Sequence, residues 1–114
     1  MPDLEARTIC IDIDNTLCGH ARGGDYALAE PMLGAREALQ LLRPAGWVVV
    51  LFTGRHFNQW RVTADWLSRY GFEYDQIVFG KPPARFYVDD RAIPFDGDWK
   101  GLAEKVGSLA RTSA

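Results

Sequence analysis

The segment Thr8-Ile9-Cys10-Ile11-Asp12-Ile13-Asp14-Asn15-Thr16 decides the fold. Its first half is a β-branched, apolar run without polar alternation, which is typical of a central parallel strand covered on both faces. Two carboxylates, Asp12 and Asp14, follow where the strand gives way to a loop. Because residues two apart in a strand point to the same side, we expect this pair to share one target.

The rest of the chain alternates short apolar runs with segments of helical periodicity. The apolar runs predict further strands at 47–52, 76–79 and 85–88, and the periodic segments predict helices at about 31–42, 58–70 and after residue 98. Strands that alternate with helices are typical of βαβ units in a parallel sheet. We therefore expect one α/β domain over residues 1–114, a three-layer, Rossmann-like parallel sheet with helices on both faces.

Every predicted strand ends in polar groups suited to chemistry, namely Asp12 with Asp14, Thr53, Lys81, and Asp89 with Asp90. In open parallel sheets ligands bind outside the carboxyl ends of the strands, so we expect these groups to meet in one crevice. Four clustered carboxylates would repel one another without a divalent cation. Oxygen ligands without clustered His or Cys favour Mg²⁺, and the expected ligands are the four aspartates. A metal, a lysine and a hydroxyl together indicate phosphoryl transfer.

Four segments resemble, in order along the chain, the four motifs of the haloacid dehalogenase (HAD) superfamily of phosphatases. They are Asp12-Ile13-Asp14-Asn15-Thr16, Leu51-Phe52-Thr53-Gly54-Arg55, Gly80-Lys81-Pro82 and Tyr87-Val88-Asp89-Asp90. The family commonly has Gly where Asn15 stands, but Asn also tolerates unusual backbone angles. The resemblance covers most of the chain and implies Mg²⁺-dependent hydrolysis of a phosphomonoester, and Asp14 favours phosphate over halide chemistry.

The resemblance also implies a role for each side chain of the motifs. Asp12 would be the nucleophile that forms an aspartyl-phosphate, and Asp14 would be the general acid and base, with its backbone carbonyl on the metal. Thr53 and the N–H of Gly54 would hold phosphoryl oxygens, while Lys81 would bridge Asp12 and the phosphate.

Two assignments within the motifs stay open at this point. Asp89 and Asp90 would hold Mg²⁺ directly or through water, and either of them could be the direct ligand. Arg55 would contact the substrate and its phosphate or another subunit, or else form a structural ion pair, which is the common fate of arginines.

The spacing of the motifs leaves no room for the cap domain with which HAD relatives select substrates. Residues 18–30 form only a short, glycine-rich flap, and neither His20 within it nor His56 after the second motif has an assigned role. An open site takes a large substrate or borrows a wall from another subunit, so we expect a homo-oligomer. The pattern is similar to small HAD proteins associated with capsule or surface-sugar biosynthesis, which points to a phosphorylated sugar or related small metabolite.

Composition argues against several other classes of protein. The chain has 13 basic and 15 acidic residues and a net charge of −2, so neither nucleic acid nor an anionic membrane is an expected partner. The longest apolar run, 47–52, is far shorter than the ~20 residues that span a bilayer, and the N-terminus does not resemble a signal peptide. Two cysteines suit a reducing cytoplasm, and we expect Cys10, in a central strand, to be buried and inert.

Two alternative functions remain at this stage. A receiver domain of a response regulator has a similar length, a doubly wound sheet, clustered acids, a Thr and a Lys, but its adjacent acids come first and its phospho-acceptor lies in the middle. The other alternative is a catalytically silent binding protein with the HAD fold, which the presence of all four motifs disfavours.

Overall fold

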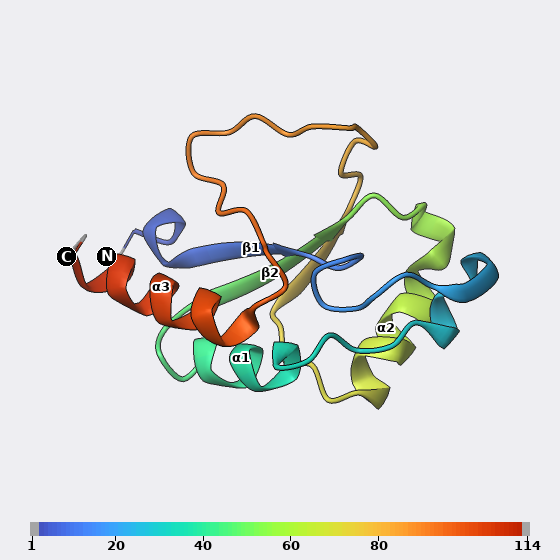
Figure 1. Ribbon diagram of the computed structural model, residues 1–114, viewed down its shortest axis with the longest axis horizontal. Helices are drawn as coiled ribbons and strands as arrows, with labels where there is room; N and C mark the ends of the chain where they lie inside the picture. Colours follow the sequence, from blue (N-terminus) through green and yellow to red (C-terminus); the bar gives the residue numbers. More distant parts are fainter. Residues whose placement is uncertain (1–2, 113–114) are drawn as a thin grey trace.

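The computed structural model describes the backbone of residues 3–112, with all side chains in that range except those of residue 22 and of residues 109–112. Within these residues the chain forms an α/β fold with a parallel sheet (Figure 1). Its strands are β1 (Thr8–Asp12), β2 (Val48–Thr53) and β3 (Gln76–Phe79), in the spatial order β1-β2-β3. Its α-helices are α1 (Ala35–Leu42), α2 (Trp60–Arg69) and α3 (Trp99–Thr112), and its short 3-10 helices are η1 (Glu5–Arg7), η2 (Arg22–Gly24), η3 (Tyr26–Leu28) and η4 (Phe57–Gln59). None of the described helices is long and apolar enough to cross a membrane.

The three strands end at the same edge of the sheet. Asp12, the last residue of β1, pairs with Phe52 of β2, and Thr53, the last residue of β2, pairs with Phe79 at the end of β3. This parallel register brings the polar groups that follow the strands to a common edge.

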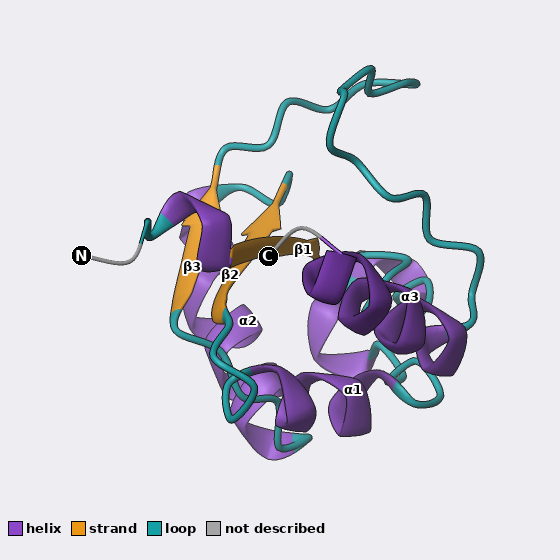
Figure 2. Cartoon of the chain, turned by 90° about the vertical axis from the view of Figure 1, so that its left-hand side faces the viewer, coloured by secondary structure: helices purple, strands orange, loops and turns teal. Residues whose placement is uncertain are grey.

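One face of the sheet is buried and the other is only partly covered. Along β2, Val49, Leu51 and Thr53 are buried, while the residues between them are half-buried. The buried side chains join one core with Leu39 of α1 and Trp66 of α2, and Figure 2 shows these two helices on the same side of the strands. The expected three-layer arrangement, with helices on both faces, is therefore not confirmed.

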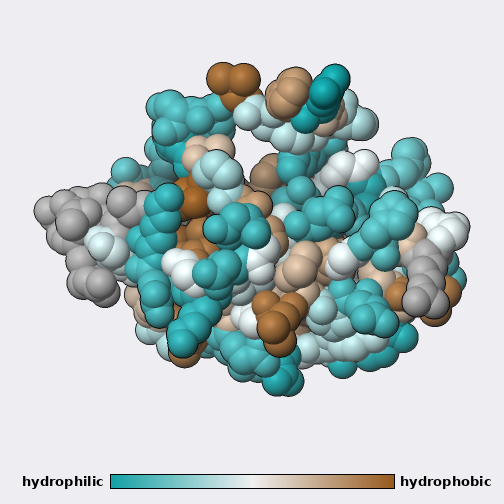
Figure 3. All heavy atoms as spheres, in the orientation of Figure 1, coloured by the Kyte–Doolittle hydropathy of each residue, from teal (hydrophilic) through white to brown (hydrophobic). Residues whose placement is uncertain are grey.

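The strand predicted at 85–88 is absent. Residues 80–98, which we call the arch, leave the end of β3 and pass over the partly covered face before α3 begins (Figure 1). Figure 3 shows an open window between the arch and the rest of the molecule. The apolar side chains that were expected in the strand, Phe86, Tyr87 and Val88, are 74%, 50% and 100% exposed.

The arch makes a side-chain contact within itself and another with η1. The hydroxyl of Tyr87 donates to the carbonyl of Pro82, and Arg91 forms an ion pair with Glu5 of η1. Among the described residues, β1 pairs only with β2, and its other edge has no strand partner. The expectation that Cys10 is buried is wrong, because its side chain on this edge strand is exposed.

The first α-helix begins at Ala35 rather than near Pro31. Gly34 precedes it with a left-handed φ of 82°, a conformation that favours glycine and interrupts the helix. A Cβ at Gly34 would also lie 3.4 Å from the Cβ of Trp99, so the glycine allows α3 to approach closely.

The flap (residues 18–30) is tied to α2 by two side chains of that helix. The indole N–H of Trp66 donates to the carbonyl of Ala29 at 2.8 Å, and the guanidinium of Arg69 donates to the carbonyl of Ala27 at 2.7 Å. Because Trp66 is almost completely buried, the end of the flap is part of the core.

Candidate active site

The chain turns sharply directly after β1. Asn15 has a left-handed φ of 61°, which asparagine adopts more readily than most residues, and the N–H groups of residues 16–18 all donate to the carbonyl of Ile13, at 3.2, 2.8 and 3.3 Å. The turn leaves the side chains of Asp12 and Asp14 at the end of the strand, 28% and 35% exposed. Both carboxylates can therefore be reached from solvent.

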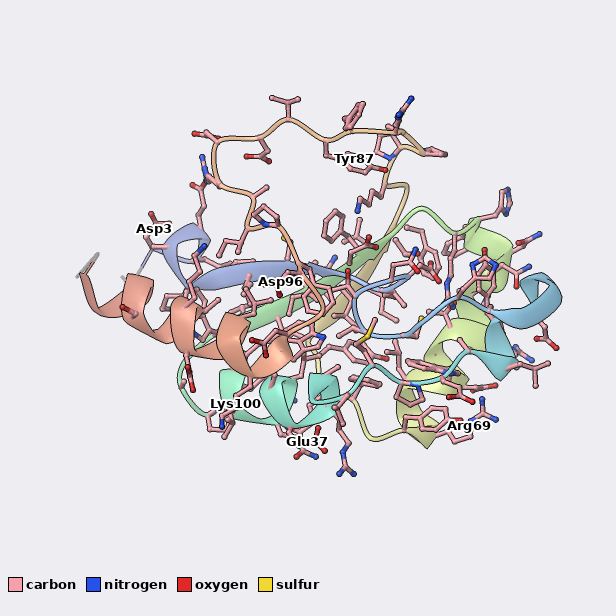
Figure 4. The ribbon with its side chains drawn as sticks, viewed as in Figure 1. Asp3, Glu37, Arg69, Tyr87, Asp96 and Lys100 are labelled. Atoms are coloured by element: carbon pink, nitrogen blue, oxygen red, sulfur yellow. The ribbon has the colours of Figure 1, made fainter. Side chains whose placement is uncertain are left out.

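Asp12 forms an ion pair with Lys81, which lies just beyond β3. The Nζ of Lys81 is 2.8 Å from Oδ2 of Asp12, and Oδ1 accepts a hydrogen bond from the N–H of Ile13 at 2.8 Å. The ammonium group also lies 4.6 Å from the ring centroid of Phe52 and 4.4 Å from that of Tyr87, which Figure 4 labels on the arch. The ion pair thus holds the ammonium group of Lys81 beside the carboxylate of Asp12.

Asp14 forms an ion pair with Arg55. The nearest contact is 2.8 Å, between Nη2 of Arg55 and Oδ1 of Asp14, and the side chain of Arg55 is only 1% exposed. Of the roles left open for Arg55, the structure shows the structural ion pair. Its side chain is too deeply buried to contact a phosphate or a second subunit in this arrangement.

Thr53 and Gly54 lie beside the two pairs, in different surroundings. The hydroxyl of Thr53 is fully buried and accepts a hydrogen bond from the N–H of Arg55 at 3.1 Å. The carbonyl of Thr53 accepts from the N–H groups of Gly80 and Lys81, both at 3.1 Å, which joins the ends of β2 and β3. Gly54 is exposed, and a Cβ there would lie 3.1 Å from the carbonyl oxygen of Lys81, so the position leaves little space for a side chain.

Asp89 and Asp90 do not join the other two aspartates. Both lie exposed on the arch, where Asp89 accepts a hydrogen bond from the N–H of Arg91 at 2.8 Å. This bond lowers the pKa of Asp89 below its ordinary value.

The aspartates as they lie do not fit a magnesium ion. Their oxygen atoms are the donors that Mg²⁺ prefers. Among residues 3–112, however, no three His, Cys, Asp or Glu side chains are grouped so that they could hold a metal ion. Asp12 and Asp14 instead each face a basic side chain.

A pocket of about 310 Å³ opens next to Asp14. Asp14 and Asn15 line it together with residues of the flap, among them His20 and Tyr26. His56 lies elsewhere, since its Nδ1 accepts from the N–H of Asn58 at 3.1 Å and so caps η4. Of the two histidines without an assigned role, only His20 therefore lines this pocket.

Three residues around Arg55 were not among the expected site residues. Thr63 of α2 accepts a hydrogen bond from the guanidinium, Tyr26 lies against it, and Cys18 has its sulfur 3.8 Å from Nη2. Thr63 could have been found in the sequence, because a polar residue on the buried stripe of a helix needs a polar partner. The sequence holds no comparable signal for Tyr26.

Comparison with known proteins gives a likeness in fold. A crystal structure of a structural-genomics target from Vibrio cholerae superposes with a TM-score of 0.71 and 25% sequence identity, covering 95% of this chain and 99% of that one. The two chains share a fold. No protein-family model and no curated protein matches this chain, and the description of the Vibrio protein names no activity.

Proposed function

We propose that the chain is a phosphatase of the HAD type that hydrolyses a phosphomonoester through a covalent intermediate on Asp12. The observation that carries the proposal is the position of Asp12, at the carboxyl end of β1 and 2.8 Å from Lys81. A carboxylate that solvent can reach is a suitable nucleophile for phosphorus, and the adjacent ammonium group offsets the repulsion between it and the anionic phosphate.

The chemistry needs one nucleophile and one group that transfers protons. An oxygen of Asp12 bonds to phosphorus while the bond from phosphorus to the leaving oxygen breaks. The ester arrives as its monoanion, and Asp14, ionised beside Arg55, takes the proton of the ester and gives it to the leaving oxygen, so an alcohol departs. Water then attacks the phosphorus of the aspartyl-phosphate, Asp14 takes a proton from the water, and the bond from phosphorus to Asp12 breaks. Asp14 passes that proton to the departing phosphate. The products are the alcohol and inorganic phosphate, and both side chains return to their first state.

Thr53, Gly54 and Lys81 complete the phosphate site in this proposal. Lys81 contacts both Asp12 and a phosphoryl oxygen, and the exposed backbone of Gly54 offers its N–H to another. The hydroxyl of Thr53 contributes once it turns from the N–H of Arg55, with which it is paired in the structure. These groups stabilise the charge on the equatorial oxygens of the transition state.

The pocket beside Asp14 supports a small leaving group. Its volume of about 310 Å³ suits a sugar or a related small metabolite, and it adjoins the carboxylate that protonates the leaving oxygen. The proposal therefore keeps a phosphorylated sugar or similar metabolite as the substrate class.

The proposal includes dependence on Mg²⁺, and it links binding of this ion to the formation of a fourth strand by residues 85–88. The aspartates of the described residues do not fit the ion in the arrangement that the structure shows. If residues 85–88 paired with the free edge of β1, the pairing would bring Asp89 and Asp90 to the strand end that carries Asp12 and Asp14. We propose this rearranged form of the arch, with a fourth strand in the sheet, as the one that binds Mg²⁺.

Assembly and location are also proposals. An open pocket and the exposed apolar side chains of the arch support a homo-oligomer in which another subunit covers the site. A strictly monomeric mass in light scattering would contradict it. We place the protein in the cytoplasm, where Cys10 and Cys18 remain free thiols, as they are in the structure; fractionation of cells tests this.

Replacement of the nucleophile tests the proposed function. The wild-type chain should turn over p-nitrophenyl phosphate and a subset of a sugar-phosphate panel, and Asp12→Asn should remove turnover while circular dichroism stays unchanged. The matched control is Asp65→Asn, which makes the same change at an exposed position of α2 and should retain activity. If the wild-type chain becomes phosphorylated once and then stops, it is a phospho-acceptor of the receiver type, and the phosphatase proposal is wrong.

A further inference from the structure

Arg55 forms a bidentate ion pair with Asp14, in which both carboxylate oxygens accept hydrogen bonds from the guanidinium. Nε of Arg55 is 3.0 Å from Oδ2, and Nη2 is 2.8 Å from Oδ1. This bidentate contact fixes the plane of the carboxylate as well as its distance from Arg55, which a single hydrogen bond would not do. The orientation of Asp14 therefore depends on where Arg55 lies.

Arg55 is in turn held on the sides that do not face Asp14. Its Nη1 donates to Oγ1 of the buried Thr63 at 3.0 Å, and its guanidinium carbon lies 3.8 Å from the ring centroid of Tyr26. Helix α2 supplies Thr63 and the flap supplies Tyr26, so Arg55 is clamped between these two elements. A guanidinium that is buried and engaged in this way has little freedom to move toward a substrate.

The carboxylate of Asp14 remains partly exposed to solvent despite its ion pair with Arg55. Its side chain is 35% exposed, and it lines the pocket that the flap covers in part. Arg55 thus presents the carboxylate to the pocket while its own side chain stays out of solvent.

We infer that Arg55 is a positioning residue that holds Asp14 at the leaving oxygen of the substrate, and that it does not bind the phosphate itself. The inference rests on the proposed function, because it assigns a use to the proton transfer at Asp14. It predicts that loss of the bidentate contact between Arg55 and Asp14 slows the cleavage of esters whose leaving group needs a proton. Esters whose leaving group departs as a stable anion should be nearly unaffected.

The test compares two esters of similar size, phenyl phosphate and p-nitrophenyl phosphate. Phenolate is a poor leaving group and needs the proton of Asp14, whereas p-nitrophenolate leaves without it. Arg55→Lys keeps a positive charge but cannot span both oxygens of Asp14. We expect kcat/KM of this variant to fall about 100-fold for phenyl phosphate and by less than about threefold for p-nitrophenyl phosphate, since kcat/KM reports the first cleavage step.

A second variant covers the case in which Arg55→Lys does not fold. Thr63→Val keeps the shape of the side chain and removes only the hydroxyl that holds Nη1 of Arg55. We expect kcat/KM to fall about tenfold for phenyl phosphate and to stay nearly unchanged for p-nitrophenyl phosphate. The matched control is Arg69→Lys on the same helix (Figure 4), where the arginine also contacts the flap but not Asp14. Its ratio of the two kcat/KM values should equal that of the wild type.

The outcomes separate the inference from the proposed function. A selective loss on phenyl phosphate supports the positioning role. An equal loss on both esters shows that Arg55 binds the phosphate or has a merely structural role, and unchanged kinetics show no role, so either result overturns the inference while the phosphatase stands. If the wild-type chain cleaves neither ester, the proposed function itself fails and the inference falls with it.

Discussion

At the scale of single residues, the two cysteines have opposite surroundings. Cys10 lies exposed on β1, whereas Cys18 is buried where the turn after β1 meets the flap. Burial raises the pKa of the Cys18 thiol to about 11, and the negative charge of Asp14 adds to the shift. Cys18 is therefore an inert thiol in the folded protein, because the raised pKa keeps it protonated.

This difference predicts the pattern of thiol labelling. Iodoacetamide at pH 8 should modify Cys10 in the native protein and leave Cys18 unmodified until urea unfolds the chain. Peptide mass spectrometry identifies the modified site, and the Cys10→Ser variant serves as the control that should take up no label. Labelling of Cys18 at the rate of Cys10 would contradict the buried position.

The same shift gives a pH dependence of stability with a definite sign. The unfolded thiol loses its proton near its model value of 9.0, while the folded thiol keeps it up to about 11. The stability contributed by the protonated thiol is therefore fully present below pH 9 and declines as the pH rises toward 11. The midpoint of urea unfolding should fall over this window, and it should fall less in Cys18→Ala.

The sequence predicted some residue contacts better than others. The resemblance implied a contact between Asp12 and Lys81, and topology accounts for part of it, because both residues lie at the edge where the parallel strands end. Strand β2 lies between β1 and β3, so the long side chain of Lys81 makes the rest of the approach. The burial of Arg55 does not follow from topology, because it depends on Thr63 and Tyr26, which come from two other elements. An arginine after a strand can equally face solvent, and only packing decides between the two.

At the scale of elements, the flap depends on its attachment to α2. Trp66 is 1% exposed, and its indole N–H is the donor for the carbonyl of Ala29. Its ring also stacks on Phe72, with centroids 5.3 Å apart. The tryptophan thus links the flap to the core both by packing and by a buried hydrogen bond.

Trp66→Phe should therefore lower the free energy of unfolding. The change leaves the carbonyl of Ala29 without its donor and creates a small void, so we expect a loss of about 2 kcal/mol in urea unfolding. Trp60→Phe makes the same change on the same helix at a position that is 45% exposed, and it should cost less than about 0.5 kcal/mol. Equal losses in the two variants would show that the contact with the flap adds nothing.

The positions of most elements could be predicted from the sequence. The apolar runs locate β1, β2 and β3 within one or two residues, and the onset of α2 and α3 agrees with their expected start. The segment at 85–88 has the same kind of composition but forms no strand. Apolar, β-branched composition indicates only a tendency toward extended backbone, whereas a strand also needs a neighbouring strand to pair with. Residues 85–88 have no such neighbour in the structure, and Tyr87 and Arg91 contact Pro82 and Glu5 instead.

At the scale of the whole molecule, the proposed rearrangement of the arch would bring the four aspartates together. In the proposed rearrangement, residues 85–88 pair with β1, and the ion pair between Arg91 and Glu5 breaks because Arg91 moves to the other end of the strand. The exposed apolar side chains of the segment would then gain a covered face. The rearrangement therefore couples burial of apolar surface to the formation of a metal site.

Hydrogen exchange tests this coupling. With Mg²⁺ and the phosphate mimic beryllofluoride, backbone amides in 85–88 and in β1 should exchange more slowly than in EDTA, and EDTA should also abolish turnover. In the double variant Asp89→Asn, Asp90→Asn the protection should be lost, while the amides of β3 should exchange as in the wild type. Identical exchange in Mg²⁺ and in EDTA, together with turnover that resists the chelator, would remove both the ion and the rearrangement from the proposal.

The unpaired side of β1 also has a consequence for handling the protein. A row of backbone donors and acceptors that face water is a template onto which extended segments of other molecules can add, and natural proteins usually shield such rows. Here the neighbouring arch presents apolar groups as well. Concentrated samples should therefore aggregate through the unpaired edge of β1. Any segment that pairs with this edge should also reduce the aggregation.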